Sequence, residues 1–413
     1  MRRILFLNRY FHPDHSATSQ LLTELAVDLV AGGERVCVIT SRQRYDDPDA
    51  RLSPVEKWQG IDILRVRTSR FGRFHLGGRA IDYLSFHLAV IPTLLRQIQP
   101  GDLVVAMTDP PLISLVAAWI TRLKKGVLVN WIQDLFPEVA QALGVAGMNT
   151  PLAALPRRLR NASLRAARVN VVLSDPMATR LRAEGIPQAA IRVIHNWADK
   201  ESIRPLAPEE NPLRAEWGLT DRCVIGYSGN LGRAHEFATA IEAARLLRDP
   251  TDPVWLFIGG GARHAGLRHQ AAAAGIDDGM RFLPYQPKER LSWSLGVADI
   301  HWISLLPELE GMIVPSKFYG IAAAGRPILF IGAENGAIAQ ELRRHACGFT
   351  VPPGDAEQLA ERIRLLRNNP ELRREMGLRA RRMLEERFDR AHAVTAWRAL
   401  LQEVSGQRLA TPP

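Results

Sequence analysis

The chain has 413 residues, of which 46% are hydrophobic and 23% are charged, and its formal net charge is +10. This length exceeds one ordinary hydrophobic core, so at least two domains are expected, and the composition excludes a disordered or collagen-like protein. The excess of positive charge indicates an anionic partner, such as a nucleotide, a phospholipid headgroup or a nucleic acid. The three cysteines, Cys37, Cys223 and Cys347, are widely separated and lie in or beside apolar runs, which argues against a disulfide framework or a zinc cluster and indicates a reducing cytoplasm.

The amino-terminal half predicts alternating strands and helices. The apolar run at 4–7 is too short for a signal peptide and predicts a first strand, which a polar loop at 10–18, a helix at 19–31 and a strand at 36–40 follow. This order predicts a parallel sheet that binds its ligands at the carboxyl ends of the strands. Further strands are expected at 61–66, 103–107, 127–131, 169–173 and 193–194.

A second series of strands and helices follows a proline-rich, acidic joint at 204–212. The two series predict an α/β protein with a first domain over 1–200, a linker over 201–215 and a second domain over 216–388. A helix within 389–413 carries Trp397 on an apolar face, and we expect it to pack back on the first domain. The strands of the second domain are expected at 223–227, 254–258, 280–283, 300–303, 328–331 and 348–351.

Two basic amphipathic segments, 71–95 and 155–168, combine arginines with aliphatic residues. Such helices lie either on an anionic membrane surface or in solvent as ordinary surface helices, and their presence in the same half favours the membrane. No apolar run is long enough to span a bilayer. We therefore expect a cytoplasmic protein that associates peripherally with the inner face of the plasma membrane.

Two glycine-containing turns follow predicted strands of the second half. The sequence SGNLGR at 228–233 offers Gly229 for close approach of a ligand, and Arg233 for paired hydrogen bonds with a diphosphate. The sequence FIGGG at 257–261 forms a second turn, expected at the same edge of the sheet. Neither turn has the spacing of a Walker loop or of a dinucleotide fingerprint, and plain strand-end turns are the alternative.

The segment 307–327, PELEGMIVPSKFYGIAAAGRP, joins an acidic loop to a short helix with Lys317 at its entry. A helix amino terminus exposes unpaired N–H groups and the positive end of the helix dipole, and a nearby ammonium adds to the attraction for an anion. An ordinary helix entry with a solvent-reaching lysine is the alternative. We interpret the segment as a candidate phosphate site.

These segments occur in order with LPYQPKERL at 283–291 and VADI at 297–300, and this order resembles the donor half of the family-four glycosyltransferases. In the first half, the segments 10–40, 130–140 and 193–199 resemble the family's first loop and helix, its acidic segment and its interdomain signature. The resemblance covers nearly the whole chain and implies the GT-B fold, in which two Rossmann-like, doubly wound domains face each other across a cleft. The nearest group is the bacterial polysaccharide glycosyltransferases of the colanic acid and O-antigen type, including fucosyl and N-acetylfucosaminyl transferases.

The resemblance implies transfer of a hexose, such as fucose or N-acetylfucosamine, from a UDP-sugar or GDP-sugar to a lipid-diphosphate-linked saccharide. It implies retention at the anomeric carbon, and neither a metal nor another cofactor. Two alternatives stay open. A sugar-nucleotide epimerase of the same fold would need a histidine and carboxylate set, and a nucleic-acid-binding protein would suit the net charge but lacks an aromatic stacking platform. The oligomeric state is not predicted.

The resemblance and the turns together give a set of expected site residues. Arg233 and Lys317 would stabilise the departing diphosphate, and Asp134, at the carboxyl end of a strand, would orient the acceptor unless it only caps a helix. The acceptor-binding residues are expected to be His12, Ser16, Asp134 and Glu138. The donor-binding residues are expected to be Gly229, Asn230, Arg233, Gly260, Tyr285, Gln286, Glu310, Pro315, Ser316, Lys317 and Glu334.

The chain departs from the family at one important point. The family's donor motif has two spaced glutamates, and Met312 and Gly320 stand at their places here. In the family the second glutamate holds the nucleotide ribose, so that contact has no assigned residue. Glu308 or Glu310 is the expected place of a displaced carboxylate, and Glu334 is a weaker substitute.

Overall fold

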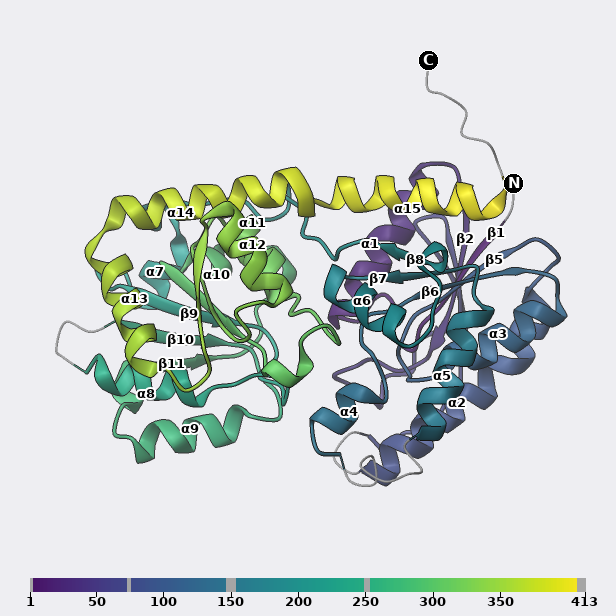
Figure 1. The fold of residues 1–413 in the computed structure, drawn as a ribbon, viewed down its shortest axis with the longest axis horizontal. Coiled ribbons are helices and arrows are strands. Elements are labelled where there is room, and N and C mark those ends of the chain that lie inside the picture. The colour runs from purple at the N-terminus through teal and green to yellow at the C-terminus, as the bar shows by residue number, and fades with distance from the viewer. Residues whose placement is uncertain (1–2, 73–75, 146–153, 249–252, 407–413) are drawn as a thin grey trace, which may run out of the picture. The chain divides into compact units, whose positions relative to one another are not determined.

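The chain folds into two compact α/β units. Unit 1 comprises Met1–His195 together with Ala393–Pro413, and unit 2 comprises Asn196–His392. Each has a central, mainly parallel sheet with helices along it, which confirms the predicted fold class (Figure 1). The computed structural model describes four stretches of the chain, residues 3–72, 76–145, 154–248 and 253–406.

The sheet of unit 1 has eight strands in the order β3-β4-β2-β1-β5-β6-β7-β8. Every pairing is parallel except that of β3 with β4. The sequence pattern missed β3, because its side chains are half exposed and form no apolar run. The strands are β1 (Arg3–Leu7), β2 (Arg35–Ser41), β3 (Val55–Trp58), β4 (Ile61–Val66), β5 (Leu103–Ala106), β6 (Val127–Trp131), β7 (Val169–Val172) and β8 (Ile191–Val193).

Helices α2, α3 and α5 of unit 1 lie side by side (Figure 1). Phe86, Val90 and Leu94 recur at helical spacing on α2 and are fully buried against Leu5 and Leu7 of β1. The helices are α1 (Ala17–Ala31), α2 (Leu76–Gln97), α3 (Ile113–Leu123), α4 (Glu138–Ala142), α5 (Ala154–Ala166), α6 (Asp175–Ala183) and the 3₁₀ turn η2 (Gln188–Ala190). This packing leaves the outer faces of α2, α3 and α5 exposed.

The sheet of unit 2 has six parallel strands in the order β11-β10-β9-β12-β13-β14. The chain reverses its direction of travel across the sheet between β9 and β12, and in such sheets ligands bind beyond the carboxyl ends of the strands at that point. The strands are β9 (Val224–Ser228), β10 (Val254–Ile258), β11 (Met280–Leu283), β12 (Ile300–Ser304), β13 (Ile328–Ile331) and β14 (Gly348–Val351).

The helices of unit 2 cover an aromatic core built on Tyr227, Phe257 and Trp302. The α-helices are α7 (Pro212–Glu216), α8 (Ala238–Leu246), α9 (His264–Ala273), α10 (Leu291–Gly296), α11 (Lys317–Ala323), α12 (Ala337–His345), α13 (Ala356–Asn368) and α14 (Pro370–Met383). The shorter turns are η3 (Pro208–Glu210), η4 (Asp277–Gly279), η5 (Lys288–Arg290), η6 (Pro307–Leu309) and the π turn η7 (Leu384–Phe388).

Helix α15 (Arg390–Ser405) returns the chain to unit 1, since its residues from Ala393 onwards belong there. Trp397 is fully buried, and its ring centroid lies 4.8 Å from that of Trp131 on β6. The Arg398 guanidinium donates a hydrogen bond to the Asp28 carbonyl near the end of α1. The helix therefore supplies part of the core of unit 1.

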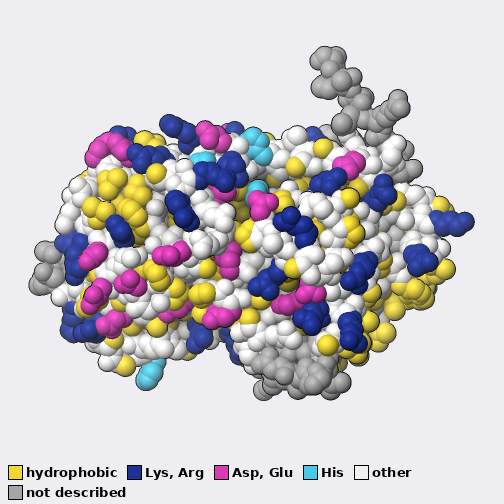
Figure 2. Space-filling model, viewed as in Figure 1, with side chains coloured by type: hydrophobic (Ala, Val, Ile, Leu, Met, Phe, Trp, Pro, Cys, Tyr) yellow, Lys and Arg dark blue, Asp and Glu magenta, His cyan; other side chains and the backbone are white. Residues whose placement is uncertain are grey.

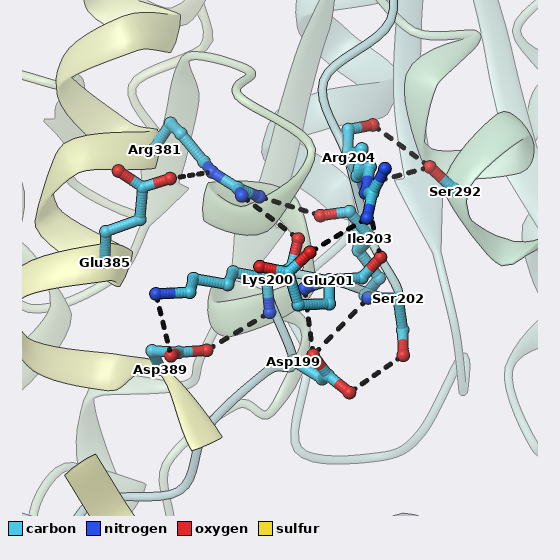
Figure 3. A network of polar contacts seen from close by, with 10 residues as sticks. All are labelled: Asp199, Lys200, Glu201, Ser202, Ile203, Arg204, Ser292, Arg381, Glu385 and Asp389. Carbon is cyan, nitrogen blue, oxygen red and sulfur yellow. Dashed lines mark hydrogen bonds and ion pairs between the residues drawn. The ribbon is translucent and has the colours of Figure 1, made fainter. Parts of the chain in front are cut away.

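Within unit 2, the stretch that enters the unit is tied to the stretch that leaves it (Figure 3). Ala198 forms a parallel bridge with Asp389, whose carboxylate also lies 3.5 Å from the Lys200 ammonium. The Arg381 guanidinium donates to the Lys200 and Ile203 carbonyls, and to the carbonyl of Ala323 at the last residue of α11. The guanidinium of the partly buried Arg381 thus joins the entering stretch, α14 and α11.

Candidate active site

The two glycine turns of unit 2 lie against each other beyond β9 and β10. The Gly229 N–H donates to the Ile258 carbonyl at 2.8 Å, and the Leu231 N–H donates to the Gly260 carbonyl at 2.8 Å. At Gly259, where φ is +131°, an added Cβ would stand 2.3 Å from the Gly229 carbonyl oxygen. The turns can approach this closely only because glycine occupies that position.

Lys317 lies directly on the first turn. It is the first residue of α11, and an added Cβ at Gly229 would stand 3.0 Å from its Cε. Its Nζ is 2.9 Å from Nε2 of His235 and 5.0 Å from the centroid of the Tyr227 ring. Burial lowers the pKa of this ammonium to about 7. The expected cation and the expected glycine turn are therefore in contact.

The other residues expected at the first turn differ in exposure. Arg233 and Asn230 are exposed, and among the described residues the Arg233 guanidinium has no hydrogen-bond or ion-pair partner. The Asn230 carbonyl accepts a hydrogen bond from the Tyr227 hydroxyl at 3.0 Å, which fixes the backbone of the turn. A solvent-exposed guanidinium beside the turn remains accessible to an anionic ligand.

The residues after β11 border the second turn. The Tyr285 hydroxyl donates to the Gly260 carbonyl at 3.3 Å, although the side chain is 60% exposed. The Gln286 amide donates to the carbonyl of Pro284. Tyr285 therefore forms one wall of the glycine turns.

Of the carboxylates proposed as substitutes, Glu310 has a structural role of its own. The Glu310 carboxylate accepts a hydrogen bond at 2.9 Å from the N–H of Ala337, the first residue of α12, so it caps that helix. Glu334 and Glu308 are exposed. Gly320, where the family places its second glutamate, is half buried within α11.

Two more expected donor residues flank Lys317 in sequence. Pro315 is buried and Ser316 is exposed at the amino-terminal end of α11. The Ser316 side chain makes no capping hydrogen bond with the helix. Its hydroxyl is consequently available to a ligand of the exposed helix end.

In unit 1, Asp134 lines a cavity of about 30 Å³ beyond the carboxyl ends of β5 and β6. Burial raises the pKa of its carboxyl group, and a hydrogen bond with the Thr108 side chain opposes that rise. Ser114, Asn130 and Arg160 also line the cavity. The sequence prediction that Asp134 lies at a strand's carboxyl end agrees with this placement.

The surroundings of Arg160 differ from those predicted for the basic helix 155–168. The side chain is buried rather than solvated, and its guanidinium pairs with the buried Glu138 carboxylate at 2.6 Å. The cause is local, because a buried charge needs a partner and Glu138 begins α4 beside it. Glu138, expected to contact the acceptor, therefore has a structural partner.

The two residues expected from the first loop also have partners. The His12 ring stacks on the Trp58 ring of β3 with centroids 3.7 Å apart. The Ser16 hydroxyl donates to the Asp14 carboxylate at 2.5 Å, at the residue before α1. Neither residue is among those that line the Asp134 cavity.

Sequence reasoning missed two residues of these sites, Tyr83 in unit 1 and His235 in unit 2. Tyr83 has its pKa raised to about 12 by burial, with further increases from Asp109 and Asp134 and opposition from Arg79 and Arg9, so these groups form one electrostatic cluster. In unit 2 the missed residue is His235. Its position two residues after Arg233, the last residue of the turn already singled out, was the available signal.

Among the described parts of the chain, no group of three His, Cys, Asp or Glu side chains converges as a metal site. The described helices include none with the length and apolarity required to cross a membrane. The cysteines at 37, 223 and 347 are free thiols, and burial raises the pKa of each.

Acid is expected to destabilise unit 2 through two buried histidines. Burial lowers the pKa of His235 to about 3 and that of His301 to about 4, below the ordinary value of 6.5. Because the unfolded chain then binds more protons, the free energy of unfolding should fall as the pH drops from 6.5 towards 4, by up to about 1.4 kcal/mol per pH unit for each histidine. Urea unfolding across this range measures the slope.

Asparagine in place of His301 should flatten the acid slope, because one titrating group is removed. The same replacement at the exposed His269 is the matched control and should leave the slope unchanged. An equal slope in wild type and in the His301→Asn variant would contradict the assignment.

Comparisons with known proteins show which sequence families the two halves of the chain resemble. Residues 210–383 match the domain described as glycosyl transferases group 1, and residues 17–197 match the glycosyl transferase 4-like domain. WbjE of Pseudomonas aeruginosa, described as a glycosyltransferase, is 26% identical over 65% of this chain and 67% of its own. WcaI of Escherichia coli K12, described as a colanic acid biosynthesis glycosyl transferase, is 24% identical over 78% of this chain and 81% of its own.

The fold also matches a solved structure. HepE of Anabaena, solved in complex with UDP-glucose, superposes with a TM-score of 0.74 at 16% identity and covers 98% of this chain and 100% of its own. Identity this low speaks for the fold alone. The two domain matches span most of the chain, and the sheets of both units have the doubly wound order that the GT-B fold requires. Residues 210–383 thus match a group 1 glycosyl transferase domain, residues 17–197 match a glycosyl transferase 4-like domain, and the chain has the GT-B fold.

Proposed function

We propose that this glycosyltransferase transfers a hexose or a 6-deoxyhexose from a UDP-sugar or GDP-sugar to a lipid-diphosphate-linked saccharide. The reaction would belong to the synthesis of a bacterial surface polysaccharide. The observation that carries the proposal is the contact of Lys317 with the glycine turn at Gly229. Backbone turns of glycine with an adjacent ammonium suit a diphosphate. The similarity to WcaI supports a role in polysaccharide synthesis, and the UDP-glucose complex of HepE supports a nucleotide sugar as the donor. Fucose and N-acetylfucosamine are the proposed sugars.

The proposed reaction proceeds with retention and needs no metal. The bond between the anomeric carbon and the diphosphate oxygen breaks while the acceptor oxygen bonds to the same face of that carbon. The acceptor proton passes to the departing phosphate oxygen. Lys317 and Arg233 stabilise the negative charge on the leaving diphosphate, which lowers the barrier more than it tightens ground-state binding. Asp134 accepts a hydrogen bond from an acceptor hydroxyl.

Neither alternative function is favoured. A sugar-nucleotide epimerase would need a histidine and carboxylate set for acid–base chemistry, whereas His235 at this turn is hydrogen-bonded to Lys317. A nucleic-acid-binding role conflicts with the match of both halves to glycosyl transferase domains.

A thermal-shift panel of nucleotides and sugar nucleotides tests the donor. UDP or GDP and their sugars should stabilise the protein, because a ligand at a hundred times its Kd adds about 2.7 kcal/mol and raises a midpoint by several degrees. The shift should persist in EDTA and disappear in the Lys317→Ala variant. A shift with a nicotinamide dinucleotide instead would overturn the proposed function.

We further propose that unit 1 rests on the inner face of the plasma membrane. Apolar side chains are exposed on the outer faces of α2, α3 and α5, and Figure 2 shows hydrophobic side chains gathered over α2 and α3 with Lys and Arg nearby. Basic and apolar groups together suit an anionic bilayer surface. Arg73 and Phe74 of the predicted segment 71–95 lie outside the described residues. The exposed apolar side chains are Ile81, Leu84, Leu88, Trp119, Leu123, Leu155 and Leu159.

Glutamine in place of the exposed Arg157, Arg158 and Arg165 should weaken the affinity for anionic liposomes on the order of 100-fold, because each basic residue near such a surface contributes about 1 kcal/mol. Co-sedimentation with the liposomes measures this affinity. Activity on a soluble acceptor analogue should be unchanged. The control triple, glutamine at the exposed Arg245, Arg344 and Arg374 of unit 2, alters the net charge equally and should sediment normally. Equal binding of both triples would contradict the assignment of α5 to the membrane.

A further inference from the structure

The partner of the Lys317 ammonium is a histidine. Nζ lies 2.9 Å from Nε2 of His235 and 5.0 Å from the centroid of the Tyr227 ring. No ion pair joins Lys317 to a carboxylate among the described residues. An ammonium held only by neutral groups keeps its charge uncompensated until an anion arrives.

The direction of the Lys317–His235 hydrogen bond follows from the other side of the ring. Nδ1 of His235 lies 2.5 Å from the Ser304 carbonyl oxygen, which can only accept. Nδ1 therefore carries the ring proton, and Nε2 presents a lone pair. Lys317 must be the donor to Nε2.

The His235 ring is fixed from several elements. It is buried, and its ring packs edge-on against Tyr227 and Phe237 with centroids 6.0 Å and 6.3 Å away. The Leu306 N–H donates to the Ala234 carbonyl at 3.0 Å, which joins the loop of His235 to the end of β12. The acceptor nitrogen is thus held in one place relative to the glycine turns.

We propose that His235 is a positioning residue for the donor site: it fixes the Lys317 ammonium beside the glycine turns, where the diphosphate of the sugar nucleotide would bind. The inference rests on the proposed function, because it takes Lys317 as the group that meets the diphosphate. The histidine itself touches neither substrate nor reacting atoms. It acts on the donor site only by accepting one hydrogen bond from the Lys317 ammonium.

The same arrangement links diphosphate binding to proton uptake. The groups in contact with Lys317 are His235 and Tyr227, and burial keeps both uncharged near neutral pH because it lowers the pKa of His235 and raises that of Tyr227. Burial lowers the pKa of Lys317 to about 7. A bound diphosphate is the missing counter-charge and raises that pKa, so nucleotide binding above neutral pH should take up a proton.

Replacing His235 with glutamine or with asparagine distinguishes the hydrogen bond at Nε2 from the one at Nδ1. Glutamine places a polar atom near the position of Nε2 and can accept from Lys317, whereas asparagine reaches only the position of Nδ1 and can serve the Ser304 carbonyl alone. Titration calorimetry with UDP and GDP, in buffers of different ionisation enthalpy at pH 6, 7 and 8.5, gives the affinity and the proton uptake of each variant.

The proposal predicts an order of affinities. His235→Gln should bind the nucleotide within a few-fold of wild type and keep the proton uptake, whereas His235→Asn should bind about tenfold more weakly, as expected for one lost hydrogen bond to a charged group. Equal behaviour of the two variants, or the reverse order, would overturn the role of His235.

The wild-type protein provides a test that needs no variant. Nitrogen-15 NMR of the His235 ring should report a neutral ring protonated at Nδ1 from pH 5 to 9, and the Nε2 signal should shift when UDP or GDP is added. A ring protonated at Nε2 would overturn the inference, even if a variant failed to fold.

Failure of the inference differs from failure of the proposed function. If Lys317→Met abolishes nucleotide binding while the His235 variants behave alike, the diphosphate site stands and the positioning role falls. If Lys317→Met binds UDP and GDP as tightly as wild type, the diphosphate assignment itself falls, and the positioning role falls with it.

Discussion

Replacing Lys317 with alanine is expected to lower kcat about 10²–10³-fold, the effect typical of removing one preorganised group from a developing negative charge. Lys317 is the cation that contacts the glycine turn, and its charge would meet the leaving diphosphate in the transition state. The fold should survive, because burial already disfavours the charged form of this side chain. Turnover of the purified enzyme with its donor and acceptor measures the loss.

Lys288→Ala is the matched control for the Lys317 substitution. Lys288 is an exposed lysine of the same unit, in η5, so its replacement removes one positive charge from a solvent-exposed position. It should leave kcat within about twofold of wild type, as for most surface substitutions. Arg233→Ala should also lower kcat, and near-normal turnover in both Arg233→Ala and Lys317→Ala would eliminate the diphosphate site.

Replacing Gly259 with alanine is expected to remove nucleotide binding and to lower the free energy of unfolding of unit 2 by roughly 3 kcal/mol. The residue has a φ of +131°, and its new Cβ would stand 2.3 Å from the Gly229 carbonyl oxygen. Backbone cannot yield as a flexible side chain can, so the two turns must separate. Denaturant unfolding and calorimetry with UDP and GDP measure the two effects.

Gly266→Ala is the contrasting control for Gly259. Gly266 is exposed within α9 with nothing within 4 Å of an added Cβ, so alanine should stabilise that helix by about 0.5–1 kcal/mol. Nucleotide binding should not change. If Gly259→Ala bound nucleotide normally, close contact of the turns would be irrelevant to the donor site.

The fold was predictable where buried strands form apolar runs. The runs at 254–258 and 328–331 match β10 and β13 residue for residue, because strands covered on both faces of a parallel sheet leave a simple signal. Strand β3 was not predictable, because it is an antiparallel edge strand whose pattern is half exposed. The pattern of apolar residues therefore reveals a strand when the strand is buried, and a half-exposed strand gives no clear pattern.

The candidate site was predictable in part. The glycine turns and Lys317 carry local signals, and the structure brings them together. The pairing of Arg160 with Glu138 and that of Lys317 with His235 join residues far apart in sequence, and no local pattern records them. Arg160 belongs to a helix rich in arginine, so its burial could not be read from its neighbours in the chain.

Helix α15 bears on the order in which this protein can fold on the ribosome. Its Trp397 fills the core of unit 1 against Trp131, yet it is translated only after the whole of unit 2. Domains generally fold in order of synthesis, but here the first to be made lacks a core residue until the second has emerged. Until α15 has been made, Trp131 therefore lacks the ring that packs against it in the finished protein.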